Sequence, residues 1–301
     1  MKILNFGSLN VDYIYELEHL VLPGETIASG KLTITTGGKG LNQSVALARA
    51  GAEVFHAGAI GSSDKEILKG FLDNNGVNTE NVMILPEPGG HAMIQLDREG
   101  RNSIVLFGGT NRRIDRTFAD KVLEGFGAGD FLLLQNEISS VGYIMDSART
   151  RGMKIYFNPS PANSELEEYP IRQVDTLILN EVEGEQLTGE KEPDRILDVL
   201  LAKYPAMKIV LTLGEKGSVY ADRGGREYQE IFRNEVVDTT AAGDTFTGYF
   251  IASVSRMGDI KTSLKYASAA ASIAVSRLGA ARSIPSIEEV EAFIGKMAEG
   301  M

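Results

Sequence analysis

The stretch FLLLQNEISSVGYIMDSARTRGMKIYFNP, residues 131–159, decides the fold class. It begins with the apolar run 131–136 and ends with a second apolar run at 154–159. Between them, residues 141–151 place apolar side chains at helical spacing. Short continuous apolar runs are typical of strands buried on both faces of a parallel sheet. We therefore predict a strand, a crossover helix and a second, parallel strand.

The same rhythm repeats along the chain. Further strands are predicted at 3–6, 54–59, 176–180 and 208–214, and further helices at 43–50, 67–75, 181–188, 193–203, 242–257, 261–277 and 286–298. The alternation predicts a three-layer α/β/α fold with a mainly parallel central sheet. We expect residues 1–301 to form one such domain.

Two segments break the rhythm, residues 11–36 and 90–108. Both alternate apolar and polar residues, which is typical of strands with one face in water. We predict that they form a small additional β-sheet, and we interpret this sheet as a lid. Two decorative hairpins are the alternative.

Composition excludes several classes of function. The net charge of −11 argues against a nucleic-acid partner or a membrane surface, although backbone N–H groups of an acidic protein can still bind an anion. The sequence has no cysteine, so disulfides and thiolate metal sites are excluded, and its three histidines show no metal-binding spacing. No apolar run approaches 18 residues and the first residues do not resemble a secretory signal, so we expect a cytoplasmic protein.

The segment DTTAAGDTF, residues 238–246, precedes a predicted helix. Small residues at 241–243 allow successive N–H groups to point at one anion, beside the positive end of the helix dipole. In the first helical turn, Asp244 can accept a proton from a hydroxyl that attacks phosphorus. The alternative is an ordinary acid in a first turn, where acids are favoured in any case.

Two further segments suggest a polar ligand. Gly37, Gly38 and Gly40 surround Lys39 before a helix, but a P-loop would need Ser or Thr after the lysine, and a glycine-rich turn is the alternative. Asn10 and Asp12 share one face of a strand and suit the vicinal hydroxyls of a sugar, whereas the alternative is an Asx turn.

Two more segments suggest a metal ion and a nucleotide. In LILNEVEGEQLTG (177–189), Asn180, Glu183 and Glu185 can bind Mg²⁺ directly or through water, or Asn180 can simply cap the following helix. The turn containing Gly214 and Gly217 can lie against a nucleotide or merely reverse the chain.

The segments GGKGLNQSVALARAG (37–51) and DTTAAGDTFTGYF (238–250) resemble the two signature motifs of the ribokinase family of carbohydrate and nucleoside kinases. GSLNVD (7–12), PGET (23–26), LNEVEGEQLTG (179–189) and TLGEKG (212–217) are similar to family motifs in the same order, so the resemblance covers nearly the whole chain. It implies a phosphotransferase that moves the γ-phosphoryl group of ATP to a sugar hydroxyl, with Mg²⁺ and an activating monovalent cation, usually K⁺.

The resemblance also implies a role for each matching residue. Asp244 corresponds to the catalytic base, with Ala241, Ala242 and Gly243 as the anion hole. The implied sugar-binding residues are Asn10, Asp12, Gly38, Lys39, Gly40, Asn42, Glu137 and Asp244. The implied nucleotide-binding residues are Asn180, Thr212, Leu213, Gly214, Glu215, Lys216, Gly217 and Gly243. Glu183 corresponds to the acid of the Mg²⁺ shell, and the monovalent-cation site would use Asp238, Thr240, Ala274, Arg277, Gly279 and Ser283.

Two positions depart from the expected pattern. Many family members have glycine where this chain has Ala241, whose Cβ disfavours a positive φ; alanine there resembles the branch that phosphorylates ribose. Asn136 is less apolar than expected before Glu137. The family's lid sheet covers the sugar and pairs with a second subunit, so we also expect a homodimer.

The expected reaction converts D-ribose to ribose 5-phosphate. A fructokinase, a ketodeoxygluconate-type kinase and a nucleoside kinase are the alternatives, and the last would cover its base with Tyr13, Tyr15 and Ile94. A kinase of a phosphosugar would use Arg112 and Arg113. A non-catalytic sugar- or nucleotide-binding regulator would lack the catalytic acid or the anion-hole glycine, and both are present.

Overall fold

The computed structural model describes residues 1–299. The strands of its larger sheet are β1 (Ile3–Phe6), β4 (Val54–Gly61), β5 (Asn78–Leu85), β8 (Phe131–Gln135), β9 (Lys154–Asn158), β10 (Thr176–Asn180), β11 (Lys208–Thr212), β12 (Ser218–Asp222) and β13 (Gly225–Gln229). They lie in the order β13-β12-β11-β10-β9-β8-β1-β4-β5. Every neighbouring pair from β5 to β11 is parallel, and β12 and β13 extend the sheet in antiparallel fashion.

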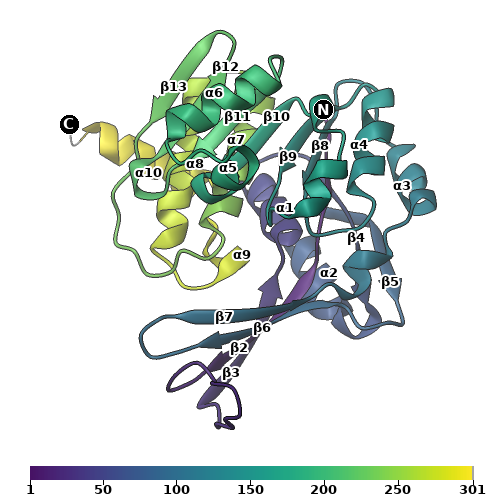
Figure 1. Cartoon of the computed structure of the whole chain (residues 1–301), viewed down its shortest axis with the longest axis vertical. Helices are drawn as coiled ribbons and strands as arrows, with labels where there is room; N and C mark the ends of the chain where they lie inside the picture. The colour runs from purple at the N-terminus through teal and green to yellow at the C-terminus, as the bar shows by residue number, and fades with distance from the viewer. Residues whose placement is uncertain (300–301) are drawn as a thin grey trace.

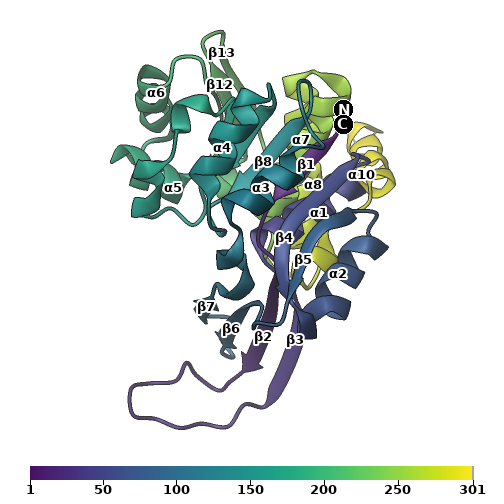
Figure 2. The same cartoon turned by 90° about the vertical axis from the view of Figure 1, so that its right-hand side faces the viewer.

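Helices cover both faces of this sheet. They are α1 (Lys39–Arg49), α2 (Lys65–Asn74), α3 (Arg116–Leu123), α4 (Val141–Thr150), α5 (Glu181–Thr188), α6 (Pro193–Lys203), α7 (Ala242–Met257), α8 (Ile260–Val275), α9 (Ala280–Ser283) and α10 (Ile287–Glu299). One core lies between the sheet and the helices α1, α2, α7, α8, α9 and α10, and a second core lies between the opposite face and α3 to α6 (Figures 1 and 2). The predicted three-layer α/β/α fold is confirmed.

The apolar runs in the sequence are continuous because each strand contributes side chains to both cores. In β8, Phe131 and Leu133 enter one core, whereas Leu132 and Leu134 enter the other. Alternate side chains of a strand point to opposite faces, so a strand covered on both sides needs no polar positions.

A second, four-stranded sheet stands apart from the first. It consists of β2 (Asn10–Glu16), β3 (Lys31–Gly37), β6 (Gly90–Leu96) and β7 (Asn102–Phe107), in the order β3-β2-β6-β7. Strands β2 and β6 are parallel, and both outer pairs are antiparallel. The sheet projects from one end of the main body (Figures 1 and 2). The prediction of a small extra sheet from 11–36 and 90–108 is confirmed, and its action as a lid stays a prediction.

Several boundaries differ from the sequence-based expectation. Helix α1 begins at Lys39 rather than at residue 43, because Gly38 adopts φ +92° and turns the chain directly from β3 into the helix. Strands β5, β12 and β13 and helices α3 and α9 were not predicted. Strand β5 mixes exposed and buried positions without a clean period, and α9 has only four residues, so neither gives a strong local pattern.

Helices α1 and α7 touch backbone to backbone. A Cβ built on Gly248 of α7 would lie 2.4 Å from the Cβ of Ala46 and 2.8 Å from the backbone nitrogen of Leu47, both in α1. Only glycine permits this approach, so Gly248 sets the distance between the two helices that begin at the two signature motifs.

Among residues 1–299, no helix is both long enough and apolar enough to cross a membrane. The cytoplasmic location stays a prediction.

Candidate functional site

Helix α7 begins beside a pocket. Ala241 caps the helix with φ +61°, so it adopts the left-handed conformation that its Cβ was expected to disfavour. Its carbonyl oxygen accepts hydrogen bonds from the backbone nitrogen and the hydroxyl of Thr245, both at 2.8 Å, which offsets part of the strain. The N–H group of Ala242 donates to the Thr239 carbonyl at 3.2 Å, and the N–H groups of Gly243 and Asp244 lie too early in the 16-residue helix to reach a carbonyl of its own, as an anion site requires.

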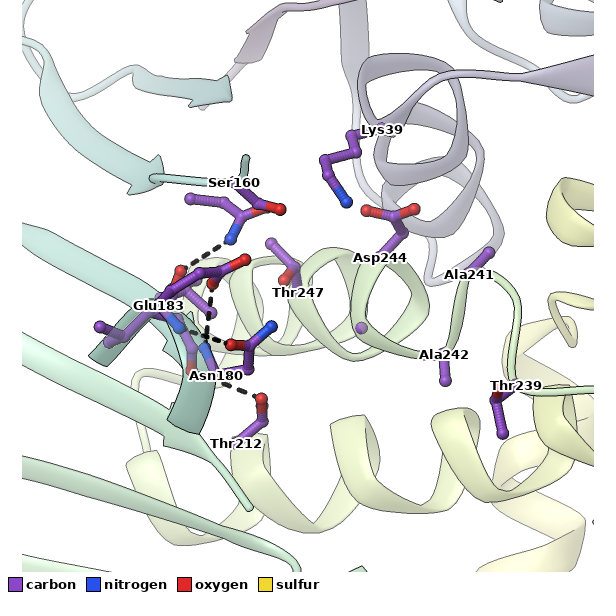
Figure 3. Close-up of a pocket in the computed structure, with 14 residues that line it drawn as sticks. Lys39, Ser160, Asn180, Glu183, Thr212, Thr239, Ala241, Ala242, Asp244 and Thr247 are labelled. Atoms are coloured by element: carbon purple, nitrogen blue, oxygen red, sulfur yellow. Dashed lines mark hydrogen bonds between the residues drawn. The ribbon is translucent and has the colours of Figure 1, made fainter. Parts of the chain in front are cut away.

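The pocket in front of this helix has a volume of about 240 Å³. Its walls come from α1, the ends of β9, β10 and β11, and the start of α7: Lys39, Asn158, Ser160, Ile178, Leu179, Asn180, Glu183, Thr212, Thr239, Ala241, Ala242, Gly243, Asp244 and Thr247. In Figure 3, Lys39 and Asp244 lie side by side at one end, and Asn180, Glu183 and Thr212 lie at the other. The pocket therefore lies at the carboxyl ends of parallel strands, where α/β proteins bind ligands.

Asp244 is buried, with 7% of its surface exposed. The side-chain nitrogens of Asn42 and Gln43 donate to its two carboxylate oxygens at 2.9 and 2.8 Å. Burial alone would lower the pKa of Lys39, but the carboxylates of Asp244, Glu137 and Glu183 together raise it, so Lys39 stays charged. The site thus pairs a held carboxylate with a fixed positive charge.

A second polar cluster continues from Lys39 toward the small sheet. One carboxylate oxygen of Glu137 accepts from the Ser8 hydroxyl and, at 3.1 Å, from the backbone nitrogen of Lys39. Burial raises the pKa of Glu137 against the opposing effect of Lys39. Burial and the nearby Glu137 charge raise the pKa of Asp12 to about 7. Two acids with raised pKa values are costly unless a ligand with hydroxyl groups supplies donors.

Glycines make room for this cluster. A Cβ on Gly37 would lie 2.1 Å from a carboxylate oxygen of Asp12, and a Cβ on Gly40 would lie 2.3 Å from the backbone nitrogen of Ser8. The glycine-rich segment is therefore a close-packed junction as well as a turn.

The carboxamide of Asn10 has a fixed orientation. Asn111 donates to its oxygen at 2.8 Å and is itself held by the backbone nitrogen of Leu9 at 3.0 Å. The nitrogen of Asn10 is thus the atom left to contact a ligand. Gly90 leaves space for this pair, since a Cβ there would lie 2.3 Å from the Asn10 oxygen.

The predicted nucleotide-binding residues divide into two groups. Asn180 and Thr212 are neighbours across β10 and β11 and line the pocket with Gly243. Leu213, Gly214, Glu215, Lys216 and Gly217 do not line it. They form the turn that reverses the chain into β12, and Gly217 packs closely on the backbone of β13. A role of this turn in nucleotide binding stays a prediction.

Glu183 combines both expected roles of its segment. It forms a capping box with Asn180, in which the backbone nitrogen of each residue donates to the side chain of the other at 3.0 and 2.9 Å. The same carboxylate lines the pocket, whereas Glu185 pairs with Lys191 at 3.5 Å and lies outside it.

The donor set fits Mg²⁺ bound to phosphates. Among residues 1–299, no three His, Asp or Glu side chains come together as a metal cage. One pocket carboxylate is what Mg²⁺ needs when phosphates and water supply the other ligands, so Glu183 fits that role.

The predicted monovalent-cation residues come from two segments that the structure joins. The backbone nitrogens of Val237 and Asp238 both donate to Val275, and the Asp238 carboxylate accepts from the backbone of Thr240 and Gly279 at 2.9 and 3.0 Å. Ala274, Arg277 and Ser283 lie along the same stretch, although the Arg277 side chain turns away to Glu289 and the Ser283 hydroxyl donates to Ala280. Potassium binding here stays a prediction.

The geometry weakens two alternative substrates. Tyr13 and Tyr15 alternate with Asp12 along β2 and so lie on the opposite face, where Tyr13 packs against the main core, although Ile94 lies on the Asp12 side. Arg113 pairs with Glu87, and Arg112 lies 3.7 Å from Glu165, so both arginines face other acids.

Several buried polar residues at the site were difficult to predict from the sequence. Gln43, Ser8 and Asn111 contact the predicted residues directly, yet only Gln43 had a signal, as the immediate neighbour of Asn42. Asn136 is polar because its side-chain nitrogen donates to Pro161 and Asn163 and its oxygen accepts from the Tyr169 hydroxyl.

Comparison with known proteins gives a consistent result. The model of the pfkB family of carbohydrate kinases matches residues 1–287. Ribokinase of Haemophilus influenzae is 33% identical over 296 residues, which cover 96% of each chain. The structure of ribokinase from Cryptococcus neoformans in complex with ADP is similar with a TM-score of 0.84 and 34% identity, over 97% of this chain and 99% of that one. Arabidopsis thaliana ribokinase complexed with ribose and ATP gives 0.83 and 28%, over 97% of each chain.

The left-handed Ala241 generates a stability prediction. We expect Ala241→Gly to raise the free energy of unfolding by up to about 1 kcal/mol, because glycine removes the Cβ strain and adds unfolded-state entropy that only partly cancels the gain. The control Ala242→Gly, at an ordinary helical position, should lower stability. Urea unfolding measures both, and a loss of stability in Ala241→Gly would contradict the strain.

Proposed function

The chain belongs to the pfkB family of carbohydrate kinases, and we propose that it transfers the γ-phosphoryl group of ATP to D-ribose, giving ribose 5-phosphate. The observation that carries this proposal is Asp244, whose held carboxylate lies between the first N–H groups of α7 and the polar cluster of Asp12 and Glu137. The Arabidopsis ribokinase, which binds ribose and ATP, has the same fold over 97% of this chain.

The proposed mechanism uses position more than covalent chemistry. The sugar lies against the small sheet, with Asp12 and Glu137 accepting from its hydroxyls and Asn10 donating through its free nitrogen. Asp244 takes the proton of the attacking hydroxyl, and the first N–H groups of α7, that of Gly243 among them, stabilise the phosphoryl group in transit. Lys39 adds a positive charge beside both partners.

The remaining ligands follow from the same pocket. Asn180 and Thr212 face the nucleotide, and Glu183 would hold Mg²⁺ through its carboxylate, where the ion neutralises charge on the ATP phosphates. A potassium ion at the segment joined by Asp238 would order the loop that leads into α7. The small sheet would close over the sugar and exclude water.

Substitution of Asp244 tests the mechanism. Asp244→Ala and Asp244→Asn should lower kcat by roughly two to four decades, the usual size of a general-base contribution, while ATP binding changes little. Turnover is measured by ADP release with ribose, 2-deoxyribose, fructose, ketodeoxygluconate and adenosine as acceptors, with ribose expected to give the highest kcat/KM.

The outcomes separate three claims: the role of Asp244, the identity of the acceptor and kinase activity itself. Near-normal turnover of Asp244→Asn on the best acceptor would remove Asp244 from the chemistry. A wild-type preference for another acceptor would overturn ribose alone. An absence of ADP release with every acceptor would favour a sugar-binding regulator.

The raised pKa of Asp12 gives a pH prediction. Only the ionised carboxylate accepts two sugar hydroxyls, so kcat/KM for the sugar should fall as the pH drops below about 7, the pKa of Asp12 in the free enzyme. Asp12→Asn should lower kcat/KM at pH 8 and remove this acidic limb. If kcat/KM of Asp12→Asn still falls over the same pH range, another ionisable group causes the fall.

We propose further that the small sheet forms a homodimer. Strand β7 is exposed along its whole length, and Ile104, Val105, Leu106 and Phe107 are each at least 49% exposed. Leu32, Ile34 and Met93 lie on the face of the sheet that carries Val105 and Phe107, and they extend the apolar surface of that face. Exposed apolar patches of this kind mark association sites, and an unpaired edge strand favours pairing with a second copy.

The oligomeric state tests this surface. Sedimentation should give about twice the chain mass of 32.6 kDa. Val105→Glu combined with Phe107→Glu should give the monomer, whereas Met257→Glu, an exposed apolar position at the end of α7, should leave the dimer intact. A monomeric wild-type protein at micromolar concentration would refute the proposal.

A further inference from the structure

A row of buried side-chain amides lies behind Asp244. Gln43 is fully buried in α1, and its side-chain nitrogen donates to one Asp244 oxygen at 2.8 Å and to the side-chain oxygen of Asn158 at 3.1 Å. Its own oxygen accepts from Gln135 at 2.6 Å. Both hydrogens and the oxygen of this amide are therefore in use.

The hydrogen bonds of Gln43 and of its neighbour Asn42 indicate different roles for the two residues. Both donate to Asp244, but the side-chain oxygen of Asn42 is buried and has no partner among the described residues. A buried acceptor without a partner is costly, so this oxygen is the atom that an arriving hydroxyl would satisfy. Gln43 has no atom left for a substrate, and its contacts can only hold the carboxylate.

The Asp244 carboxylate determines which way each side-chain amide of the row is oriented. A carboxylate only accepts, so Gln43 must turn its nitrogen toward it and its oxygen toward Gln135. Gln135 must then donate, and its second hydrogen bond, at 3.0 Å, goes to the oxygen of Asn5. The oxygen of Gln135 has no partner among residues 1–299, which is the cost of directing its donors this way.

The row ends deep in the core. Asn5 donates to the Ser44 hydroxyl at 2.9 Å, and Ser44 contacts His56 at 2.8 Å. Burial lowers the pKa of His56 to about 4, so this end of the row is neutral. The side-chain hydrogen bonds of Gln43 go to Asp244, Asn158 and Gln135, and the side chains of Ser44 and His56 are not among its partners.

We propose that Gln43 is a positioning residue that fixes the orientation of the Asp244 carboxylate, while Asn42 is the partner that contacts substrate. The inference rests on the proposed role of Asp244 as the base. The charged groups that face Asp244 are Lys39 and Glu137, and the Asp244 charge contributes to the raised pKa of each of them.

The test compares two substitutions of Gln43 at saturating sugar and ATP. Gln43→Met keeps the length and removes the donor, and Gln43→Glu keeps the shape and places a second acid against the carboxylate. We expect kcat of Gln43→Met to fall by about tenfold to a hundredfold, with KM for both substrates within about threefold, since the lost interaction orients the base. Saturation with sugar keeps the titration of Asp12 in the free enzyme out of the kcat profile.

The pH profile of kcat distinguishes a positioning role from a loss of stability, because a loss of stability alone does not shift this profile. Gln43→Met removes a hydrogen-bond donor to the carboxylate, so the pH at which kcat falls on the acidic side should rise by about one unit. The like charge in Gln43→Glu should raise this pH further. Thermal melting confirms that each variant is folded.

Ser44→Ala is the matched control, because it removes the Ser44 hydroxyl from the same row and leaves the side-chain hydrogen bonds of Gln43 in place. It should lower the melting temperature and leave the acidic limb in place. An unshifted limb in a folded Gln43→Met, or an equal shift in Ser44→Ala, overturns the positioning role. Full turnover of Asp244→Asn instead overturns the base itself, so the two failures are distinguishable.

Discussion

The contact between the backbones of α1 and α7 is the constraint on which the site depends. Gly248 lies one turn beyond Asp244, and the absence of its side chain lets α7 approach Ala46 and Leu47. At this distance the amides of α1 reach the carboxylate of α7, although about 200 residues separate them in sequence. The pocket opens where these two helices begin, so the start of α7 and the cluster around Lys39 share one boundary.

The central sheet was predictable because its strands are buried on both faces and therefore read as unbroken apolar runs. Helix α7 has the bounds expected from its pattern, 242–257, since its first turn follows small residues and its last turn ends before Gly258. The antiparallel edge was missed for the opposite reason. Strands β12 and β13 follow a glycine turn that is also compatible with a nucleotide loop, and only the pairing of β12 with β11 decides between the two.

The residues that line the pocket were predictable where they belong to a local motif, as for Lys39, Asp244 and Asn180, and less so where long-range pairing decides. Asn111 lies about 100 residues from Asn10, and no spacing in either segment indicates that one orients the other. Ala241 shows the limit of a conformational rule, because tertiary contacts hold an alanine at φ +61°. The raised pKa of Asp12 likewise depends on Glu137, which comes from a distant loop.

The small sheet joins the body through paired glycines at 37–38, 89–90 and 108–109. At this joint, side chains on Gly37, Gly90 or Gly109 would collide with Asp12, Asn10 or the backbone of Gly89 at 2.1 to 2.4 Å. Steric clashes therefore exclude larger side chains at these glycine positions. Change is less restricted on the face of the sheet that carries Asp12, where Ile94 is only partly buried.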